Sequence, residues 1–173
     1  VRYQTAKDLL ADLRNLGQRL KFEEELEQSL DTVETPIVDR VVTSETRRAT
    51  DNVDAYHSYL KGRYCWNKRT EEDVKKAIEY FKKAIDADPA YALPYVGLAD
   101  AYIVLGSFGI ATLAPKEAFP KARQAAERAL EIDDTLAEAH AALAYCLGSY
   151  DWNWTLCERE FKRALELNPA YTT

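Results

Sequence analysis

AIEYFKKAIDADP, residues 77–89, decides the fold of this chain because its spacing returns twice further along the sequence. The related segments are ARQAAERALEIDD at residues 122–134 and CEREFKRALELNP at residues 157–169. In all three, small or aromatic side chains stand at the first, fifth and eighth positions, and Pro or Asp stands at the thirteenth. Steps of four and three residues place these side chains on one face of a helix. The segments therefore predict three equivalent helices, each packed through one face of small and aromatic residues.

A second pattern precedes the two later helices. Four side chains return 45 residues further on with the same spacing: Tyr95, Leu98, Ala99 and Tyr102 correspond to His140, Leu143, Ala144 and Leu147. The small residue in each set allows two helices to approach closely. Each repeat is therefore expected to be a hairpin of two helices. Thr70 and Thr155, each followed three residues later by an acid, are expected to cap the second helices of their hairpins.

The composition favours an all-α chain and argues against several classes of protein. The 173 residues are 47% hydrophobic and 30% charged, and 6 Gly and 6 Pro are too few for a many-stranded sandwich. A net charge of −6 argues against nucleic-acid binding through a basic surface. No stretch predicts a membrane span or a signal peptide, and the 3 cysteines lack paired spacing, so a cytoplasmic location is expected. Because the chain starts at Val1 and contains no methionine, we expect it to be part of a longer protein.

The repeated spacing resembles the tetratricopeptide repeat, whose pattern is W-x2-L-G-x2-Y, then A-x3-F, then P, over about 34 residues. The resemblance covers residues 52–173, with repeats at about 52–89, 90–134 and 135–169 and the start of a further one at 170–173. The second repeat departs from the pattern, because Ala84 and Ala129 lie 45 residues apart. The resemblance implies an all-α solenoid of about three helical hairpins. It also implies a concave groove for a protein or peptide ligand, lined by the first helix of each hairpin.

The register of the first helix, about residues 53–67, sets the expected groove. Gly62 is expected to be its point of close approach, with Ser58 and Cys65 inward. The groove is then predicted to present Tyr59, Arg63, Trp66, Val96, Asp100, Ile103, Ala141 and Tyr145. Aromatic residues with an arginine are typical of binding hot spots. An alternative is that Tyr59 and Trp66 pack against the linker or the N-terminal helix.

The predicted groove does not suit peptides that are recognised through a terminal carboxylate. The resemblance implies that repeat proteins gripping a carboxylate-ended peptide use lysines and asparagines. The corresponding positions here include Glu138 and Ala142. We therefore do not expect such a peptide as the ligand.

No catalytic, cofactor-binding or metal-binding residue is predicted. His140 replaces a packing aromatic and is expected to be buried or half-buried, and Cys146 and Cys157 occupy packing positions. The apolar insert at residues 105–114 is expected to fold over its own hairpin, with an interaction loop as the alternative. Trp152 and Trp154 are expected to wedge the third hairpin.

Residues 1–30 read differently from the repeats. RYQTAKDLLADLRNL, residues 2–16, begins a helix whose leucines recur at steps of four, three and four: Leu9, Leu13, Leu16 and Leu20. This text resembles the last helix of bacterial serine/threonine protein kinase domains. The resemblance implies a kinase domain upstream, with the repeats as its regulatory or partner-recruiting part. Residues 31–51 are expected to form a linker.

Two functions remain open at this point. The first is a protein–protein interaction module of a signalling kinase. The second is a structural or oligomerising segment whose groove is filled by its own N-terminal helix, with a homodimer through the leucine stripe as one form. Enzymatic activity is not expected within these residues, because they lack the Gly-rich loop and the HRD and DFG motifs of a kinase.

Overall fold

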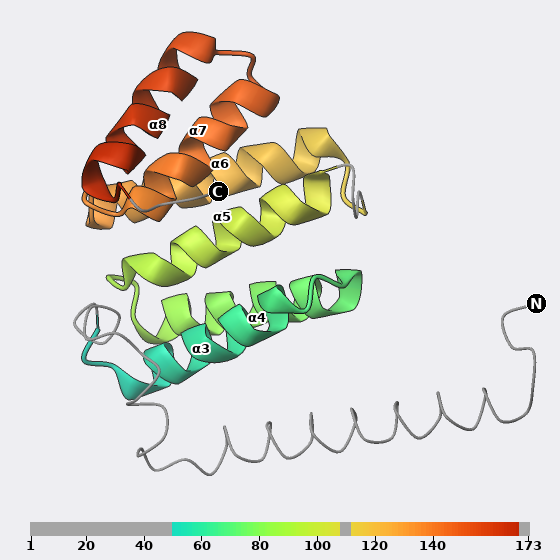
Figure 1. The fold of residues 1–173 in the computed structure, drawn as a ribbon. Helices are drawn as coiled ribbons and strands as arrows, with labels where there is room; N and C mark the ends of the chain where they lie inside the picture. Colours follow the sequence, from blue (N-terminus) through green and yellow to red (C-terminus); the bar gives the residue numbers. More distant parts are fainter. Residues whose placement is uncertain (1–49, 108–111, 170–173) are drawn as a thin grey trace, which may run out of the picture. The chain divides into compact units, whose positions relative to one another are not determined.

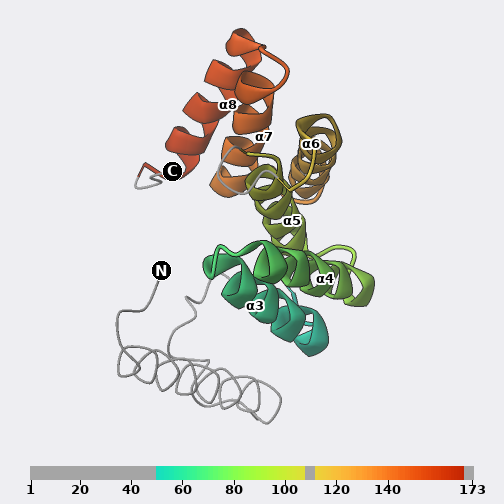
Figure 2. The same cartoon turned by 90° about the vertical axis from the view of Figure 1, so that its right-hand side faces the viewer.

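The computed structural model describes residues 50–107 and 112–169, and every regular element within them is an α-helix. Figure 1 shows these helices stacked as hairpins in chain order, and Figure 2 shows the same stack from the side. The helices are α3 (Val53–Asn67), α4 (Glu71–Ala87), α5 (Ala92–Gly106), α6 (Pro115–Ile132), α7 (Ala137–Ser149) and α8 (Trp154–Leu167). Each helix packs on the next, and α5 also packs on both α3 and α7. The predicted all-α chain of helical hairpins is confirmed.

Local chemistry fixes where the helices begin. The side chain of Thr70 accepts a hydrogen bond from the backbone N–H of Asp73 at 3.1 Å, as expected for the cap of α4. The cap expected at Thr155 is wrong: α8 begins at Trp154, and Asn153 accepts from the backbone N–H of Leu156 at 3.2 Å. An asparagine ahead of the threonine already satisfies the first free N–H groups, so the helix starts earlier.

Phe81 holds the first two hairpins together. Its ring is fully buried, and it lies against Gly62 of α3 and Gly97 of α5. A Cβ atom built on either glycine would stand 2.5 Å from the ring, well inside van der Waals contact. The expectation that Gly62 marks a close approach is confirmed, and Gly97 has the same role on the next hairpin.

The small residues of the repeated pattern line the remaining helix contacts. They are all buried: Ala77, Ala84, Ala99, Ala122, Ala126, Ala129, Ala144, Cys157 and Ala164. In the third hairpin the sulfur of Cys157 takes the position that the alanines occupy elsewhere, and it lies 2.8 Å from a Cβ built on Gly148. The cysteine is therefore a packing residue, as expected.

Four predicted features lie outside the described residues. They are the N-terminal helix at residues 1–30 with its stripe of Leu9, Leu13, Leu16 and Leu20, nearly all of the linker at 31–51, the centre of the insert at 108–111, and the further repeat at 170–173. The end of the insert is described at Leu113, which is half-buried and whose backbone N–H donates to the carbonyl of Leu105 at 3.2 Å.

Candidate functional site

The first helices of the three hairpins are neighbours in space, because α5 packs directly on α3 and on α7. We call the surface that α3, α5 and α7 share the first-helix face. It carries the eight residues that the sequence predicted for a groove. The structure divides them into side chains that are available to a partner and side chains that are not.

Three of the eight are buried, which corrects the prediction. Tyr59 is only 8% exposed, because its ring packs on Phe81 at 6.0 Å and edge-on against Tyr91 at 5.4 Å between centroids. Val96 is buried against Ala129 and Ala139, and Ala141 is buried against Ala164 of α8. The sequence register put Ser58 inward and Tyr59 outward, but Ser58 is half-buried and the ring of Tyr59 packs on Phe81 and Tyr91 in the core.

The five other residues stay at least partly accessible. Arg63, Trp66, Asp100 and Ile103 are half-buried, and Tyr145 is exposed. Ile103 packs near Phe119, and Tyr145 stacks on Phe119 at 6.4 Å between ring centroids. These residues run across α3, α5 and α7 and remain the candidates for binding.

Arg63 is the centre of a charged cluster between the first two hairpins. Its Nη1 lies 3.5 Å from Oδ2 of Asp100, which joins α3 to α5. Its guanidinium lies 4.8 Å from the ring centroid of Trp66, and that of Arg69 lies 3.7 Å from the same ring. Both distances are within the range of cation–π attraction. Arg69 was not predicted, since it reaches the ring from the turn after α3.

The carboxyl group of Asp100 is largely removed from solvent. Burial raises its pKa to about 6, and the charge of Glu138 on α7 adds to the rise, while Arg63 and Arg69 oppose it. Its side chain is 26% exposed, so it can still be reached from outside. Glu138 forms no ion pair or hydrogen bond with the other described residues. Two carboxylates, Asp100 and Glu138, therefore lie near two guanidinium groups, those of Arg63 on α3 and of Arg69 in the turn after it.

His140 lies away from this cluster and has a structural role. Its Nδ1 is 2.7 Å from Oε2 of Glu160 and its Nε2 is 3.0 Å from the carbonyl oxygen of Asp134. Its side chain is 12% exposed, which confirms the expectation of a half-buried histidine. Arg159 donates to the other carboxylate oxygen of Glu160. Burial raises the pKa of Glu160, but the hydrogen bonds from His140 and Arg159 outweigh it, so the pKa is lowered overall.

Two features are absent from residues 50–107 and 112–169. Among them, no cluster of three or more His, Cys, Asp or Glu side chains could hold a metal ion. None of the helices at 50–107 and 112–169 is both long and apolar enough to cross a membrane.

Comparison with known proteins identifies the architecture. No protein-family model matches this sequence, and no curated protein matches it. Among solved structures, the TPR domain of Arabidopsis OM64 is similar, with a TM-score of 0.58 and 20% identity over 71% of this chain and 89% of that one. The first TPR domain of Spaghetti (RPAP3) bound to the HSP90 peptide SRMEEVD has a TM-score of 0.56 and 19% identity, covering 71% of this chain and 86% of that one.

The second TPR domain of Spaghetti, bound to the same HSP90 peptide, has a TM-score of 0.54 and 17% identity over 73% of this chain and all of that one. Identities this low establish a shared fold and nothing further about the chain. The described part of the chain has the tetratricopeptide-repeat fold, an all-helical solenoid of hairpins.

Proposed function

We propose that this chain is a protein-interaction module that binds an extended segment of another protein along the first-helix face. The observation that carries the proposal is the Arg63, Trp66 and Asp100 cluster, where a guanidinium, an indole and a carboxylate meet at a junction of two hairpins and remain partly accessible. Tryptophan and arginine are the residues most enriched at the energetic centres of interfaces. Two of the similar solved structures hold a peptide, which supports the same use of the fold here.

The charges on the face favour a partner segment without an acidic end. Asp100 and Glu138 would repel the carboxylates of a peptide such as SRMEEVD, while Arg63 is already engaged by Asp100 and Arg69 lies over the ring of Trp66. A segment with neutral or basic side chains would meet no such repulsion. The proposed ligand therefore differs in charge from the peptide bound by the similar structures.

We also propose which kind of parent protein this module belongs to. The resemblance of residues 2–16 to the last helix of bacterial kinase domains supports a place beside a serine/threonine kinase in the cytoplasm, as its partner-recruiting or regulatory region. The alternative is that residues 1–30 cover the face of their own chain, or pair with a second copy, through the four leucines. That alternative rests on the need to bury the leucine stripe.

Peptide display on the full chain tests the binding proposal. We expect selected peptides to bind through the face, so that Trp66→Ala and Arg63→Ala each weaken them by tenfold or more in fluorescence anisotropy. Tyr80→Ala, on α4 and half-buried, is the matched aromatic control and should leave affinity within twofold. The peptide SRMEEVD should not bind. Tight binding of that peptide, or selected peptides insensitive to both variants, would contradict the proposal.

A second pair of variants separates the alternative. If residues 1–30 occupy the face, Leu13→Asp with Leu16→Asp should raise peptide affinity and change the mass measured by light scattering when a dimer is involved. If the face is free for a partner, both quantities should stay as in the unmodified chain. Circular dichroism melts of every variant separate loss of binding from loss of fold.

A further inference from the structure

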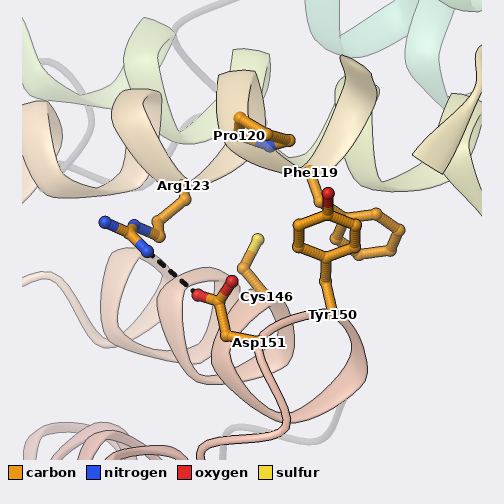
Figure 3. Close-up of a pocket in the computed structure, with 6 residues that line it drawn as sticks. All are labelled: Phe119, Pro120, Arg123, Cys146, Tyr150 and Asp151. Carbon is orange, nitrogen blue, oxygen red and sulfur yellow. Dashed lines mark hydrogen bonds and ion pairs between the residues drawn. The ribbon is translucent and has the colours of Figure 1, made fainter. Parts of the chain in front are cut away.

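A pocket lies where α6 meets the end of α7, apart from the charged cluster of the first-helix face. Its volume is about 200 Å³. At roughly 30 Å³ for each water molecule, this is room for about seven waters or one large side chain. Figure 3 shows the side chains that line it: Phe119, Pro120, Arg123, Cys146, Tyr150 and Asp151.

One side of the pocket is apolar and rigid. The rings of Phe119 and Tyr150 stack nearly parallel, at 5.3 Å between centroids and 4° between planes. Cys146 points toward the space between the aromatic pair and the ion pair (Figure 3). It is 1% exposed, and burial raises the pKa of its thiol to about 12. The thiol is therefore neutral and acts as a small apolar surface rather than as a nucleophile.

The other side of the pocket is polar, but its charges are already matched. Arg123 donates through Nη1 to Asp151 at 3.0 Å and through Nε to Glu127 at 3.1 Å. Within the lining, an added cation would meet the guanidinium of Arg123 and an added anion would meet the carboxylate of Asp151, while Glu127 lies outside it. The pocket therefore discriminates against charged side chains and accepts a neutral one.

The chain continues from Asp151 into an exposed aromatic pair. Trp152 is 71% exposed and Trp154 is 63% exposed, with their rings edge-to-face at 6.1 Å between centroids. The expectation that both wedge the third hairpin is thus wrong for most of their surface. Trp152 also has a φ of 55°, in the left-handed region that disfavours a bulky residue. A tryptophan kept exposed in a strained turn beside a pocket is a feature of contact sites.

We propose that this pocket is an anchor site for one neutral, apolar side chain of a partner polypeptide, with Trp152 and Trp154 covering the residues that flank the anchor. The charge-matched walls select the side chain, and the exposed indoles add apolar contact area next to the pocket in the chain. This site lies apart from the charged cluster of Arg63, Trp66 and Asp100, although Phe119 in its lining also contacts Tyr145 of the first-helix face.

Titration of the full chain with capped amino acids, followed by NMR, tests the anchor site. The probes are N-acetyl-leucinamide and N-acetyl-phenylalaninamide, compared with N-acetyl-lysinamide and the amide of N-acetyl-glutamate. We expect the two apolar probes to bind at millimolar concentration and to shift the signals of Cys146, Tyr150 and Asp151. The charged probes should bind at least fivefold more weakly.

Two tyrosines provide a matched pair of variants. Tyr150 stacks on Phe119 and lines the pocket, whereas Tyr80 is half-buried on α4 and is not part of the lining. Tyr150→Ala should weaken the apolar probes by fivefold or more, and Tyr80→Ala should change their affinity by less than twofold. If Tyr150→Ala melts too low to be used, nuclear Overhauser effects between the leucinamide methyl groups and Cys146 in the unmodified chain supply the same information.

Three results would overturn the proposal. One is the absence of shifts at the pocket with either apolar probe, and another is equal binding of charged and apolar probes. The third is a dependence of the Tyr150 and Trp152 signals on protein concentration alone, which would assign the pocket to a second copy of this chain. None of these results bears on the peptide-display experiment, so failure here is distinct from failure of the first-helix face.

Discussion

Gly62→Ala is the substitution that most directly tests how the hairpins pack. The new methyl group would stand 2.5 Å from Cε1 and 2.6 Å from Cδ1 of Phe81, whereas carbon atoms in contact prefer about 3.5–4 Å. The ring cannot move away freely, because it is fully buried and its other side lies against Gly97. Overpacking of this kind destabilises a core by about 1–3 kcal/mol.

A second effect of the same substitution has the opposite sign. Alanine is favoured over glycine inside a helix by roughly 0.5–1 kcal/mol. The net expectation for Gly62→Ala is a loss of about 1–2 kcal/mol of unfolding free energy. For a domain of this size that corresponds to a fall of roughly 4–8 °C in Tm. Urea denaturation and circular dichroism melts of the full chain measure both quantities.

The double variant Gly62→Ala with Phe81→Leu isolates the contact. Phe81→Leu alone leaves space in the core and should cost about 1–2 kcal/mol. In that background the added methyl group has room, so Gly62→Ala should become neutral or stabilising by up to about 1 kcal/mol. The reasoning is refuted if Gly62→Ala raises the Tm of the unmodified protein, or if its effect is the same with leucine at position 81.

Three further outcomes follow from the turns and the buried acids. Trp152→Gly should raise the unfolding free energy by about 1 kcal/mol in urea denaturation, because glycine adopts a positive φ without strain. Arg69→Gly, at a φ of 56°, should gain less stability because it also loses the contact between Arg69 and the indole of Trp66. An equal gain from both substitutions would contradict that loss. Asp100 has its pKa raised from 3.8 to about 6, so the folded state binds more protons than the unfolded state between these pH values. The unfolding free energy relative to that of Asp100→Asn should therefore fall by up to roughly 3 kcal/mol as the pH rises from 4 to 6.5. A difference between the two proteins that does not change with pH would contradict the burial of the carboxyl group. Glu160 has a lowered pKa, so the stability that its charge adds is present above pH 4.5 and is lost as the pH falls through the folded pKa. Glu160→Gln should therefore destabilise the protein at pH 7 and much less at pH 3. An equal loss of stability at both pH values would assign the effect to packing against His140.

The fold could be predicted from the sequence because the same spacing of buried residues occurs three times. Steps of four and three between Ala77, Phe81 and Ala84 specify a helix and its buried face, and two later copies exclude coincidence. The exception at the start of α8 is local. Asn153 and Thr155 are both good caps, and only the backbone path through Trp152 determines which one is used.

The candidate site was harder to predict from the sequence because it depends on contacts between residues of different helices. A single helix shows which residues share a side, but Tyr59 is buried through contacts with Phe81 of α4 and with Tyr91, which no pattern within α3 contains. Arg69 and Tyr150 stand in or next to turns, where no periodicity applies. Their contacts with Trp66 and Phe119 join residues that no sequence spacing relates. Arg63 and Asp100 were both predicted, yet their ion pair was not.

The energetic state of Asp100 connects the fold to the proposed binding. A carboxylate whose pKa is raised to about 6 destabilises the folded chain at neutral pH, and one contact with Arg63 at 3.5 Å offsets only part of that effect. A basic group from a partner segment would offset more of it, so part of the binding free energy would come from relieving the buried charge. Asp100→Asn should then stabilise the free chain at pH 7 and weaken a basic peptide, two effects of opposite sign from one substitution. A purely structural acid would not show this pair of effects, because removing it would change stability without changing affinity.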